Sequence, residues 1–284
     1  QDFPVLTISS GPTNSIRGAG ALSKVENGIV IDVGGTTSDG GVLVNFFPRE
    51  STQAAQIGGV LTNFRMPDVV AVGIGGGTIV RFKEGKCELG PDSVGYQLKE
   101  KAIAFGGNTP TLSDFFLAND ELKIEGSRDA SILREAIEKN AAISYEEALI
   151  AVKHEIKSTI EQLVDKLKTD STEIPVIACG GGAFLLPKEI NGASKVIFPE
   201  NLEVANAFGA CIAQIGYEEE MVINTLQQEE SKALEELLQR VKNELLKNGA
   251  LQDSVKVLTK ESIPLAYLPG ATKLKVKLCG DLLG

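Results

Sequence analysis

The sequence predicts an α/β fold with a mixed β-sheet in the larger, N-terminal part of the chain, and three observations carry this prediction. Two apolar runs flank a tight turn at residues 28–47, a long amphipathic helix is expected at 144–167, and a buried strand follows at 175–179. Strands followed by helix, strand and helix in that order are typical of an α/β domain. The hairpin requires antiparallel neighbours, and the helical crossover allows parallel ones.

The region before residue 83 is predicted to consist of strands joined by turns. Val, Ile and Phe in short runs bounded by Gly, Pro and Asn are typical of such strands. The expected elements are, in order, a strand at 5–8, a turn leading into a helix from about residue 14, two strands within 28–47, and strands at 56–62 and 69–82. Residues 83–143 are rich in turn-forming residues, so we expect an irregular insert there, with one short helix near 112–117.

Residues 144–167 carry the strongest helix signal in the chain. Ser144 and Glu147 form a capping box, which satisfies two backbone N–H groups at the helix start. The following apolar residues recur at spacings of three and four, as on one buried helix face: Leu149, Val152, Ile156, Ile160, Leu163 and Leu167. Next come a strand at 175–179, a Gly-rich loop at 180–182, a strand at 194–198, and a helix at 202–215 whose small residues Ala205, Gly209 and Ala213 allow close packing.

A change of composition at Gly216 predicts a domain boundary. Residues 217–247 are rich in Glu and Lys with regularly spaced leucines, which predicts an amphipathic helix, and two short strands are expected at 255–257 and 274–278. The expected domains are therefore an α/β lobe at 1–216 and a smaller helix-and-strand extension at 217–284. The apolar stripe of the helix could pack on its own domain or on a partner helix.

Composition excludes several classes of protein. The net charge of −10 argues against a nucleic-acid-binding surface, which needs clustered Lys and Arg. No apolar run approaches the roughly 20 residues that span a membrane, and no signal-peptide pattern is present. The four cysteines are widely spaced, so we expect reduced thiols and a cytoplasmic protein. The chain starts at Gln1 rather than Met, which indicates a fragment or a processed product.

The turn between the first two strands has the composition of a phosphate cradle. Glycines let the backbone approach an anion closely, threonine hydroxyls donate hydrogen bonds, and carboxylates can hold hydrated Mg²⁺. The residues of this kind are Asp32, Gly34, Gly35, Thr36, Thr37 and Asp39. They do not form a P-loop, because the Gly-x-x-x-x-Gly-Lys-Ser/Thr pattern is absent here. An ordinary Gly-rich hairpin turn is the alternative explanation.

The Asp-x-Gly-Gly-Thr turn between two strands resembles the phosphate loop of actin-like ATPases. The resemblance implies an actin-like (ribonuclease-H-like) lobe, in which a second Gly-rich loop, here 180–182, holds the adenosine flat against the backbone. Further motifs resemble the hydantoinase A/5-oxoprolinase family of ATP-dependent amidohydrolases. These motifs are Ser9–Ala19, Asp32–Asp39, Phe47–Ser51, Asn63–Asp68, Gly75–Arg81, Gly90–Gly95, Gly180–Gly182 and Pro264–Gly270. Each motif is weak alone, but together they cover nearly the whole chain in the same order.

The resemblance implies ATP and Mg²⁺ as cofactors, and a small cyclic amide of the hydantoin or 5-oxoproline type as substrate. ATP would phosphorylate the amide oxygen, and water would then open the ring. Asp32 and Asp39 are the expected catalytic carboxylates, with Asp32 holding Mg²⁺ through water. The expected nucleotide-binding residues are Gly34, Gly35, Thr36 and Thr37 for the phosphates, and Gly180, Gly181, Gly182 and Ala183 for the adenosine. The expected cleft or substrate residues are Arg65, Asp68, Gly75, Gly76, Gly77 and Thr78, with a structural Arg65–Asp68 ion pair as the alternative for the first two.

The chain departs from the family pattern in three ways. It carries one Asp-x-Gly-Gly-Thr motif, which corresponds to the second copy of complete relatives, so the N-terminal lobe is expected to be missing. Cys179 and Gly40 stand where relatives often have glycine and an aliphatic residue. This portion alone is therefore expected to be inactive, and a second hydrolase subunit or domain and homo-oligomers are possible partners. Two alternatives stay open, a non-catalytic nucleotide-binding subunit or scaffold, and a small-molecule kinase that releases its phosphorylated product.

Overall fold

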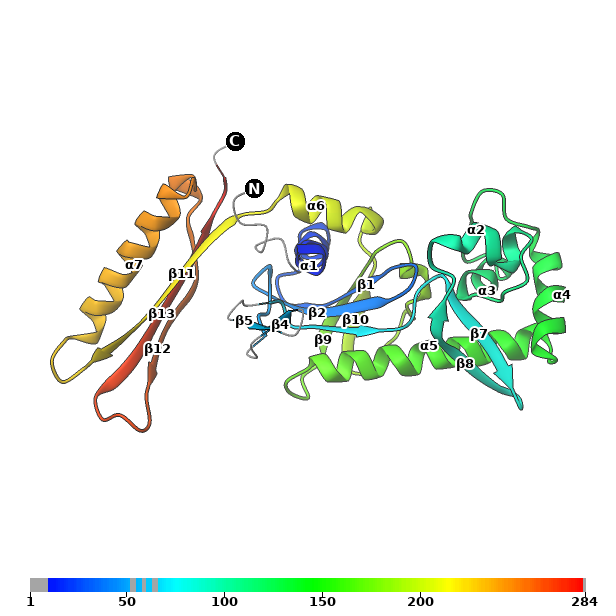
Figure 1. Cartoon of the computed structure of the whole chain (residues 1–284), viewed down its shortest axis with the longest axis horizontal. Coiled ribbons are helices and arrows are strands. Elements are labelled where there is room, and N and C mark those ends of the chain that lie inside the picture. The colour runs from blue at the N-terminus through cyan, green and yellow to red at the C-terminus, as the bar shows by residue number, and fades with distance from the viewer. Residues whose placement is uncertain (1–9, 52–54, 58–59, 63–65, 283–284) are drawn as a thin grey trace. The chain divides into compact units, whose positions relative to one another are not determined.

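The apolar run that ends at Asp32 forms a central strand, β1 (Gly28–Val33), of the main sheet. It pairs in antiparallel fashion with β2 (Ser38–Val44) and in parallel with β9 (Ile174–Cys179). The strand order is β10-β9-β1-β2-β3, and β6 also pairs with β2. The predicted mixed α/β sheet is therefore confirmed (Figure 1).

The structure is a computed structural model and describes residues 10–51, 55–57, 60–62 and 66–282. It divides into two compact units, residues 1–211 and 212–284, whereas we expected a boundary after residue 216. The remaining strands of the first unit are β3 (Phe47–Pro48), β4 (Ala55–Ile57), β5 (Val60–Thr62), β6 (Val69–Val72), β7 (Thr78–Lys83), β8 (Lys86–Ser93) and β10 (Ala193–Ile197). Its helices are α1 (Ser10–Ser23), α2 (Leu98–Lys101), α3 (Leu112–Ala118), α4 (Ala130–Ala141), α5 (Tyr145–Leu167) and α6 (Ala205–Cys211), with short 3-10 turns η2 (Gly95–Gln97), η3 (Ile103–Phe105), η4 (Ala183–Leu185) and η5 (Leu202–Val204). The second unit contains β11 (Ile215–Asn224), α7 (Glu230–Lys247), η6 (Gln252–Ser254), β12 (Lys256–Pro264) and β13 (Ala271–Gly280).

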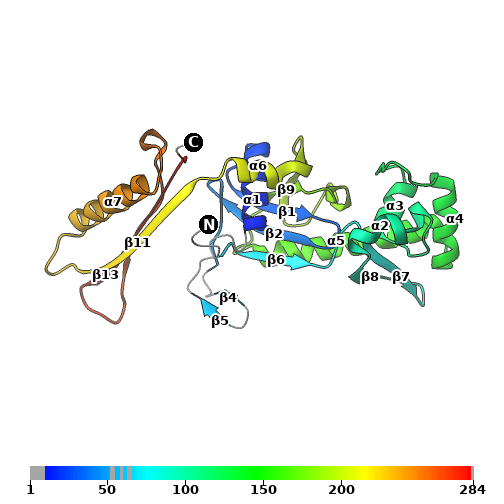
Figure 2. The same cartoon turned by 45° about the horizontal axis from the view of Figure 1, so that its top comes forward.

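The main sheet buries both of its faces. Successive side chains of a strand point to opposite faces, so Ile29 and Ile31 join the core that contains α5, whereas Val30 joins the core under α1. Helices α1 and α6 lie on one side of the sheet and α5 lies on the other (Figures 1 and 2). Gly40 faces α5, where an added Cβ would lie 2.7 Å from Cδ1 of Leu167. The absence of a side chain at Gly40 therefore lets α5 approach the sheet closely.

Small residues bring α1 and α6 into backbone contact, as the spacing of Ala205 and Gly209 predicts. A Cβ added to Gly18 would lie 1.8 Å from the carbonyl oxygen of Ala205, and one added to Gly209 would lie 1.9 Å from that of Asn14. The Asn206 side chain reinforces the contact by donating to the Gly11 carbonyl at 2.9 Å. Helix α6 is shorter than the predicted 202–215 helix, because residues 202–204 form a 3-10 turn and the helix ends at Cys211.

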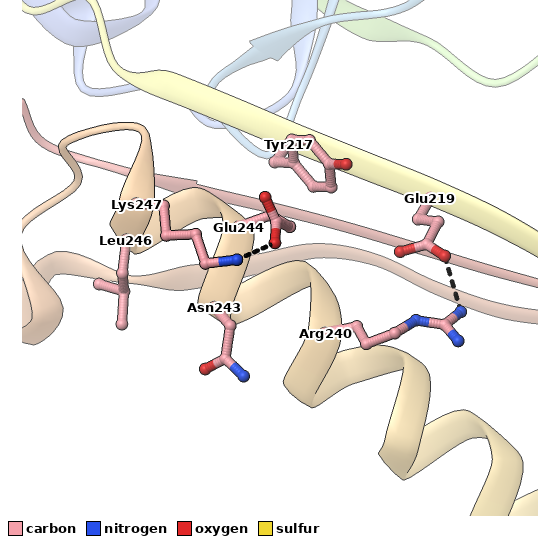
Figure 3. Close-up of a pocket in the computed structure, with 7 residues that line it drawn as sticks. All are labelled: Tyr217, Glu219, Arg240, Asn243, Glu244, Leu246 and Lys247. Atoms are coloured by element: carbon pink, nitrogen blue, oxygen red, sulfur yellow. Dashed lines mark hydrogen bonds and ion pairs between the residues drawn. The ribbon is translucent and has the colours of Figure 1, made fainter.

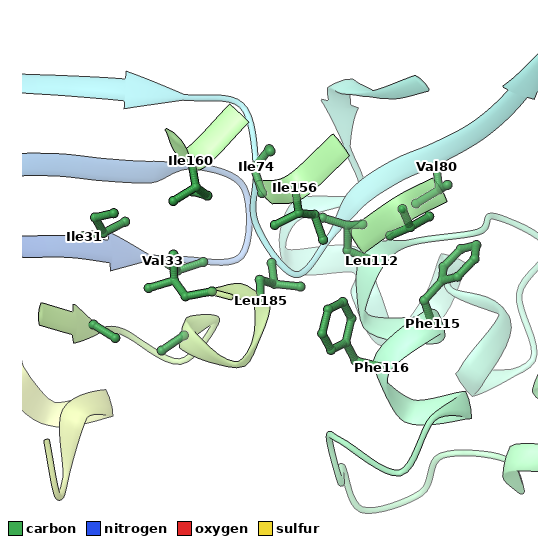
Figure 4. Close-up of a cluster of buried hydrophobic side chains, with 14 of the residues drawn as sticks. Ile31, Val33, Ile74, Val80, Leu112, Phe115, Phe116, Ile156, Ile160 and Leu185 are labelled. Atoms are coloured by element: carbon green, nitrogen blue, oxygen red, sulfur yellow. The ribbon is translucent and has the colours of Figure 1, made fainter. Parts of the chain in front are cut away.

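The segment 69–82, predicted as one strand, is divided into β6 and β7 by a turn at 73–77, of which residues 74–77 are buried. The insert at 83–143 is likewise more regular than expected, with β8 pairing with β7 and with helices α3 and α4. One continuous apolar core explains this order, because Phe115 and Phe116 of α3 pack in the same cluster as Ile31 and Ile156 (Figure 4). The sequence did not reveal this core, because the buried residues of the turn-rich insert are spaced too irregularly to show a helix or strand period.

Asp114 is a buried hub of the insert. Its Oδ1 accepts a hydrogen bond from the Ala104 N–H at 2.7 Å, and its Oδ2 accepts from the N–H and hydroxyl of Thr111 at 2.7 and 2.8 Å. We expect Asp114→Asn to destabilise the fold by about 2–3 kcal/mol, because an amide N–H₂ would face donors and leave them unsatisfied. Urea unfolding measures this loss. Asp120→Asn, at an exposed turn, is the control and should change stability by less than about 0.5 kcal/mol; equal effects of the two variants would contradict the assignment.

The helix predicted at 217–247 in the second unit is wrong over its first part. Residues 215–224 form strand β11, and the helix α7 begins only at Glu230. Side chains in β11 alternate between two faces. Met221 and Ile223 pack in the core of this unit, whereas Glu218 and Glu220 form ion pairs with lysines of β13. The apolar side of α7 is buried against its own three-stranded sheet, so it packs within its domain. Over the described residues, no helix combines the length and apolarity needed to cross a bilayer.

A groove between β11 and α7 carries mixed charge (Figure 3). Arg240 donates to the Glu219 carboxylate at 2.7 Å, and Lys247 pairs with Glu244 at 2.5 Å. These four charged side chains therefore neutralise one another within the groove.

Candidate phosphate-binding site

The residues between β1 and β2 form a tight, exposed turn. The register of the hairpin closes at Val33 and Ser38, and the Gly34 N–H donates to the Thr37 carbonyl at 2.9 Å. Gly35, Thr36 and Thr37 are exposed. The turn thus presents glycine backbone and threonine hydroxyls, both hydrogen-bond donors, at the surface.

A buried glycine turn supports this cradle from behind. The N–H groups of Gly76 and Gly77 donate to the carbonyls of Gly34 and Gly35 at 3.1 and 2.7 Å. We expected Gly75–Thr78 to face the cleft, but all four are buried. Thr78 is fully buried, and its hydroxyl accepts from the Gly75 N–H at 2.8 Å. Their contacts give these residues the role of holding the cradle in place.

Gly75→Ala is expected to weaken Mg-ATP binding by about tenfold or more, which corresponds to about 1.4 kcal/mol. An added Cβ would lie 2.5 Å from the backbone nitrogen of Thr36, so the cradle itself must shift. Gly73→Ala is the matched control, because nothing lies within 4 Å of its Cβ position. Calorimetric titration of the variants should separate the two, and indistinguishable affinities would show that the backing turn does not set the cradle.

The Gly-rich loop at 180–182 lies against the start of the same turn. An added Cβ on Gly180, whose φ is +84°, would lie 2.3 Å from Oδ1 of Asp32. The Gly182 N–H donates to the Val33 carbonyl at 2.8 Å, and its Cβ position lies 2.7 Å from the Gly34 carbonyl oxygen. Gly181 is exposed, whereas Ala183 is buried at the start of η4. The structure therefore brings the two expected nucleotide loops into contact. Ala183 was expected to line the adenosine pocket, but its side chain is buried in the core.

Two carboxylates stand beside the cradle. Asp32 and Asp39 are partners in the β1–β2 register and therefore lie on one face of the sheet. Partial burial, and then the neighbouring Asp32 carboxylate, raise the pKa of Asp39. On β9, Cys179 is paired with Asp32, and burial and then Asp32 raise the pKa of its thiol. Cys179 therefore remains a neutral thiol at pH 7 beside the site.

The donor set fits Mg²⁺. This ion keeps several waters and is bound through one or two carboxylates plus phosphate oxygens, rather than by an all-protein cage. Within the part of the chain that the structure describes, no group of three or more His, Cys, Asp or Glu could hold a metal by itself. Asp32 and Asp39 can supply the carboxylates, and the nucleotide would have to supply the rest.

Asp39→Asn is expected to stabilise the fold at pH 7 and to leave it unchanged in acid. The raised pKa means that the folded protein binds this proton more tightly than the unfolded chain does. Ionisation therefore begins to destabilise the fold near the ordinary value of 3.8, and the loss is complete above the raised value. The amide removes that loss, so the melting temperatures of variant and wild type should converge below about pH 4. A difference between the two that does not change with pH would contradict this account.

Two further residues were expected at the cleft, and one of them, Asp68, lies apart from the cradle. Arg65 falls outside the described residues. Asp68 accepts from Arg49 at 2.7 Å, and Arg49 also donates to the Leu167 carbonyl at 2.9 Å. Asp68 therefore forms a structural ion pair with Arg49, which ties this strand connection to the end of α5.

The structure adds Ser93 and Gly95 to the site. The Ser93 hydroxyl lies 3.4 Å from the Gly35 carbonyl oxygen, and the Cβ position of Gly95 lies 3.9 Å from Oγ1 of Thr36. The sequence motif Gly90–Gly95 was visible but carried no role, because its contact with the turn at 34–37 joins segments about 60 residues apart in the chain.

Known proteins are similar to this chain, one in sequence and others in fold. The acetophenone carboxylase gamma subunit of Aromatoleum aromaticum (strain DSM 19018 / LMG 30748 / EbN1) is 29% identical over 113 residues, which cover 38% of this chain and 15% of that protein. The nucleotide-free structure of acetone carboxylase aligns with a TM-score of 0.64 at 19% identity, over 96% of this chain and 49% of that one. The crystal structure of ATP-dependent caprolactamase from Pseudomonas jessenii aligns with a TM-score of 0.72 at 17% identity, over 95% and 49%.

These two structures confirm the predicted α/β fold, and this chain spans about half the length of each. The hydantoinase/oxoprolinase family profile matches residues 1–219. Since this match covers most of the 284 residues, the chain belongs to the hydantoinase/oxoprolinase family.

Proposed function

We propose that this chain supplies the phosphate- and adenosine-binding half of an ATP site, in an enzyme that hydrolyses a small cyclic amide by first phosphorylating the amide oxygen. The observation that carries the proposal is the convergence of two glycine loops on one pair of carboxylates. Gly34–Thr37 and Gly180–Gly182 touch through backbone contacts, and Asp32 lies against Gly180.

The residues would act by positioning and by neutralising charge, as in other phosphoryl transfers. The exposed turn would donate to the β- and γ-phosphates, while Gly181, whose Cβ position has no atom within 4 Å, would leave room for the nucleoside. Asp32 and Asp39 would hold hydrated Mg²⁺, which neutralises phosphate charge when bound. The amide oxygen would attack the γ-phosphorus and release ADP. Water would then add to the activated carbon, and collapse of that adduct with cleavage of the ring C–N bond would leave an acyl phosphate. A second water would add to the acyl carbon and release phosphate, which keeps the original amide oxygen, together with the ring-opened acid.

Two relatives support this choice of chemistry. One is described as an ATP-dependent caprolactamase, and caprolactam is a cyclic amide; the other is described with ATP-dependent acetone carboxylation. Because this chain covers 49% of each of those chains, the whole activity is proposed for the longer protein, with a second lobe that completes the cleft. ATP, Mg²⁺ and a cyclic amide are the proposed ligands.

A second candidate is a nucleotide-binding subunit of a multi-subunit hydrolase or carboxylase. The specific observation that favours it is the relative named as a gamma subunit of acetophenone carboxylase. In that case the chain would bind ATP and assemble with a second subunit, but it would not open a ring by itself.

An oxygen-transfer assay tests the proposal. The longer protein that contains this chain would be given Mg-ATP and 5-oxoproline or hydantoin labelled with ¹⁸O at the carbonyl oxygen. Phosphorylation at that oxygen delivers the label to inorganic phosphate as the ring opens. Unlabelled phosphate with ring opening would contradict the phosphorylated intermediate. A stable labelled phosphoproduct would indicate a kinase, and ATP binding without turnover of any amide would favour the subunit function.

A further inference from the structure

A short segment after β8, residues 93–97, forms a third wall of the phosphate cradle. The Val94 N–H donates to the Gly77 carbonyl at 2.9 Å, and the Ser93 hydroxyl lies 3.0 Å from the Cβ position of Gly77. Gly95 turns the chain with a φ of +54°, and its N–H donates to the Ser93 hydroxyl at 3.1 Å. The segment is thus anchored to the backing turn and its own backbone bonds hold its conformation.

Tyr96 stands on this anchored segment with its side chain in solvent. Its exposed fraction is 95%, whereas the preceding Val94 is 5% exposed and the Gln97 N–H donates to the Val94 carbonyl at 3.0 Å. Single exposed aromatic residues are common and need no explanation. The position of this one is informative, because it follows directly the residue that approaches the Thr36 hydroxyl. A tyrosine ring can stack on a planar group, and its hydroxyl can donate to an oxygen.

The Gly180–Gly182 loop and the 93–97 segment contact different parts of the turn between β1 and β2. The Gly180–Gly182 loop contacts Asp32, Val33 and Gly34, which precede the centre of the turn, whereas the 93–95 segment contacts Gly35 and Thr36 at its centre. A nucleotide whose nucleoside lies on Gly180–Gly182 therefore directs its phosphate chain toward the 93–97 segment. The terminal phosphate, and the oxygen that attacks it, would come nearest to Tyr96.

We propose that Tyr96 is a ligand-contacting residue at the terminal-phosphate end of the cradle. This inference rests on the proposed function, because it uses the nucleotide orientation that the two glycine loops define. It assigns to Tyr96 a role in recognising the reacting end of the ligands.

Fluorine NMR of the chain labelled with 3-fluorotyrosine tests the inference. The chain has four tyrosines, so Tyr96→Phe, Tyr145→Phe and Tyr267→Phe assign three signals by their loss. Tyr267 is the exposed control, with an exposed fraction of 97%, and Tyr145, whose buried hydroxyl donates to the Phe115 carbonyl, reports any general change of the first unit. Mg-ATP and Mg-ADP are the two probes, and calorimetry on the same sample measures binding independently.

We expect Mg-ATP to shift the Tyr96 signal along the calorimetric binding curve, and Mg-ADP, which lacks the γ-phosphate, to shift it less. The Tyr145 and Tyr267 signals should stay in place. Binding without a Tyr96 shift, or with equal shifts of all three signals, would overturn the inference and leave the proposed function intact. If calorimetry detects binding of neither nucleotide, either by this chain or by the longer protein that contains it, the proposed function fails and this inference fails with it.

Discussion

Asp32→Ala is expected to weaken Mg-ATP binding by about 10–100-fold, the range seen when a residue that orients or supports a metal's ligands is removed. An added Gly180 Cβ would lie 2.3 Å from Oδ1 of Asp32, so this carboxylate stands where the two glycine loops meet. Its loss removes negative charge from the proposed Mg²⁺ position. Isothermal titration of the chain with Mg-ATP, beside the wild type, measures the loss.

Two controls make this result specific. Asp120→Ala removes a carboxylate of the same kind, whose side chain is 74% exposed on the insert, and should leave the affinity unchanged. Asp32→Asn keeps the size of the side chain and removes the charge, so it should reproduce the loss if charge is responsible. A wild-type affinity in both Asp32 variants would show that this carboxylate does not hold the metal nucleotide.

Gly18→Ala is expected to destabilise the first unit by about 3 kcal/mol, at the upper end of typical overpacking costs. The added Cβ would lie 1.8 Å from the carbonyl oxygen of Ala205, and a backbone atom cannot move aside as a flexible side chain can. Helices α1 and α6 would have to separate. Since the Gly180 N–H donates to the Leu202 carbonyl just before α6, nucleotide binding should weaken as well.

Gly11→Ala in the same helix is the matched control. Nothing lies within 4 Å of its Cβ position, so alanine should stabilise the helix by about 0.5 kcal/mol. Urea unfolding of both variants gives the comparison. Equal stabilities of the Gly11 and Gly18 variants would show that the close helix contact does not form in solution.

Patterns confined to one element were predictable. The capping box places the start of α5 at Ser144 in both sequence and structure, and the period of the following apolar residues marks the buried face. The hairpin around Asp32 was equally clear, because glycine and threonine between two apolar runs determine a turn locally. The helix expected at 217–247 was wrong over 217–224. Charged residues alternate there with residues of the sheet core, but the helical pattern of the neighbouring α7 obscured this alternation.

The sequence alone identified the family and predicted a phosphate turn and an adenosine loop, because each motif is a short run with its own chemistry. Tertiary structure decided which of these segments touch. Gly75–Thr78 back the turn, Ser93–Gly95 flank it, and Asp68 pairs with Arg49, through contacts between segments distant in the chain. Such contacts depend on how strands and helices pack in three dimensions, and a glycine's role depends on the atom that its missing Cβ would meet. That information is not present in any local run of residues.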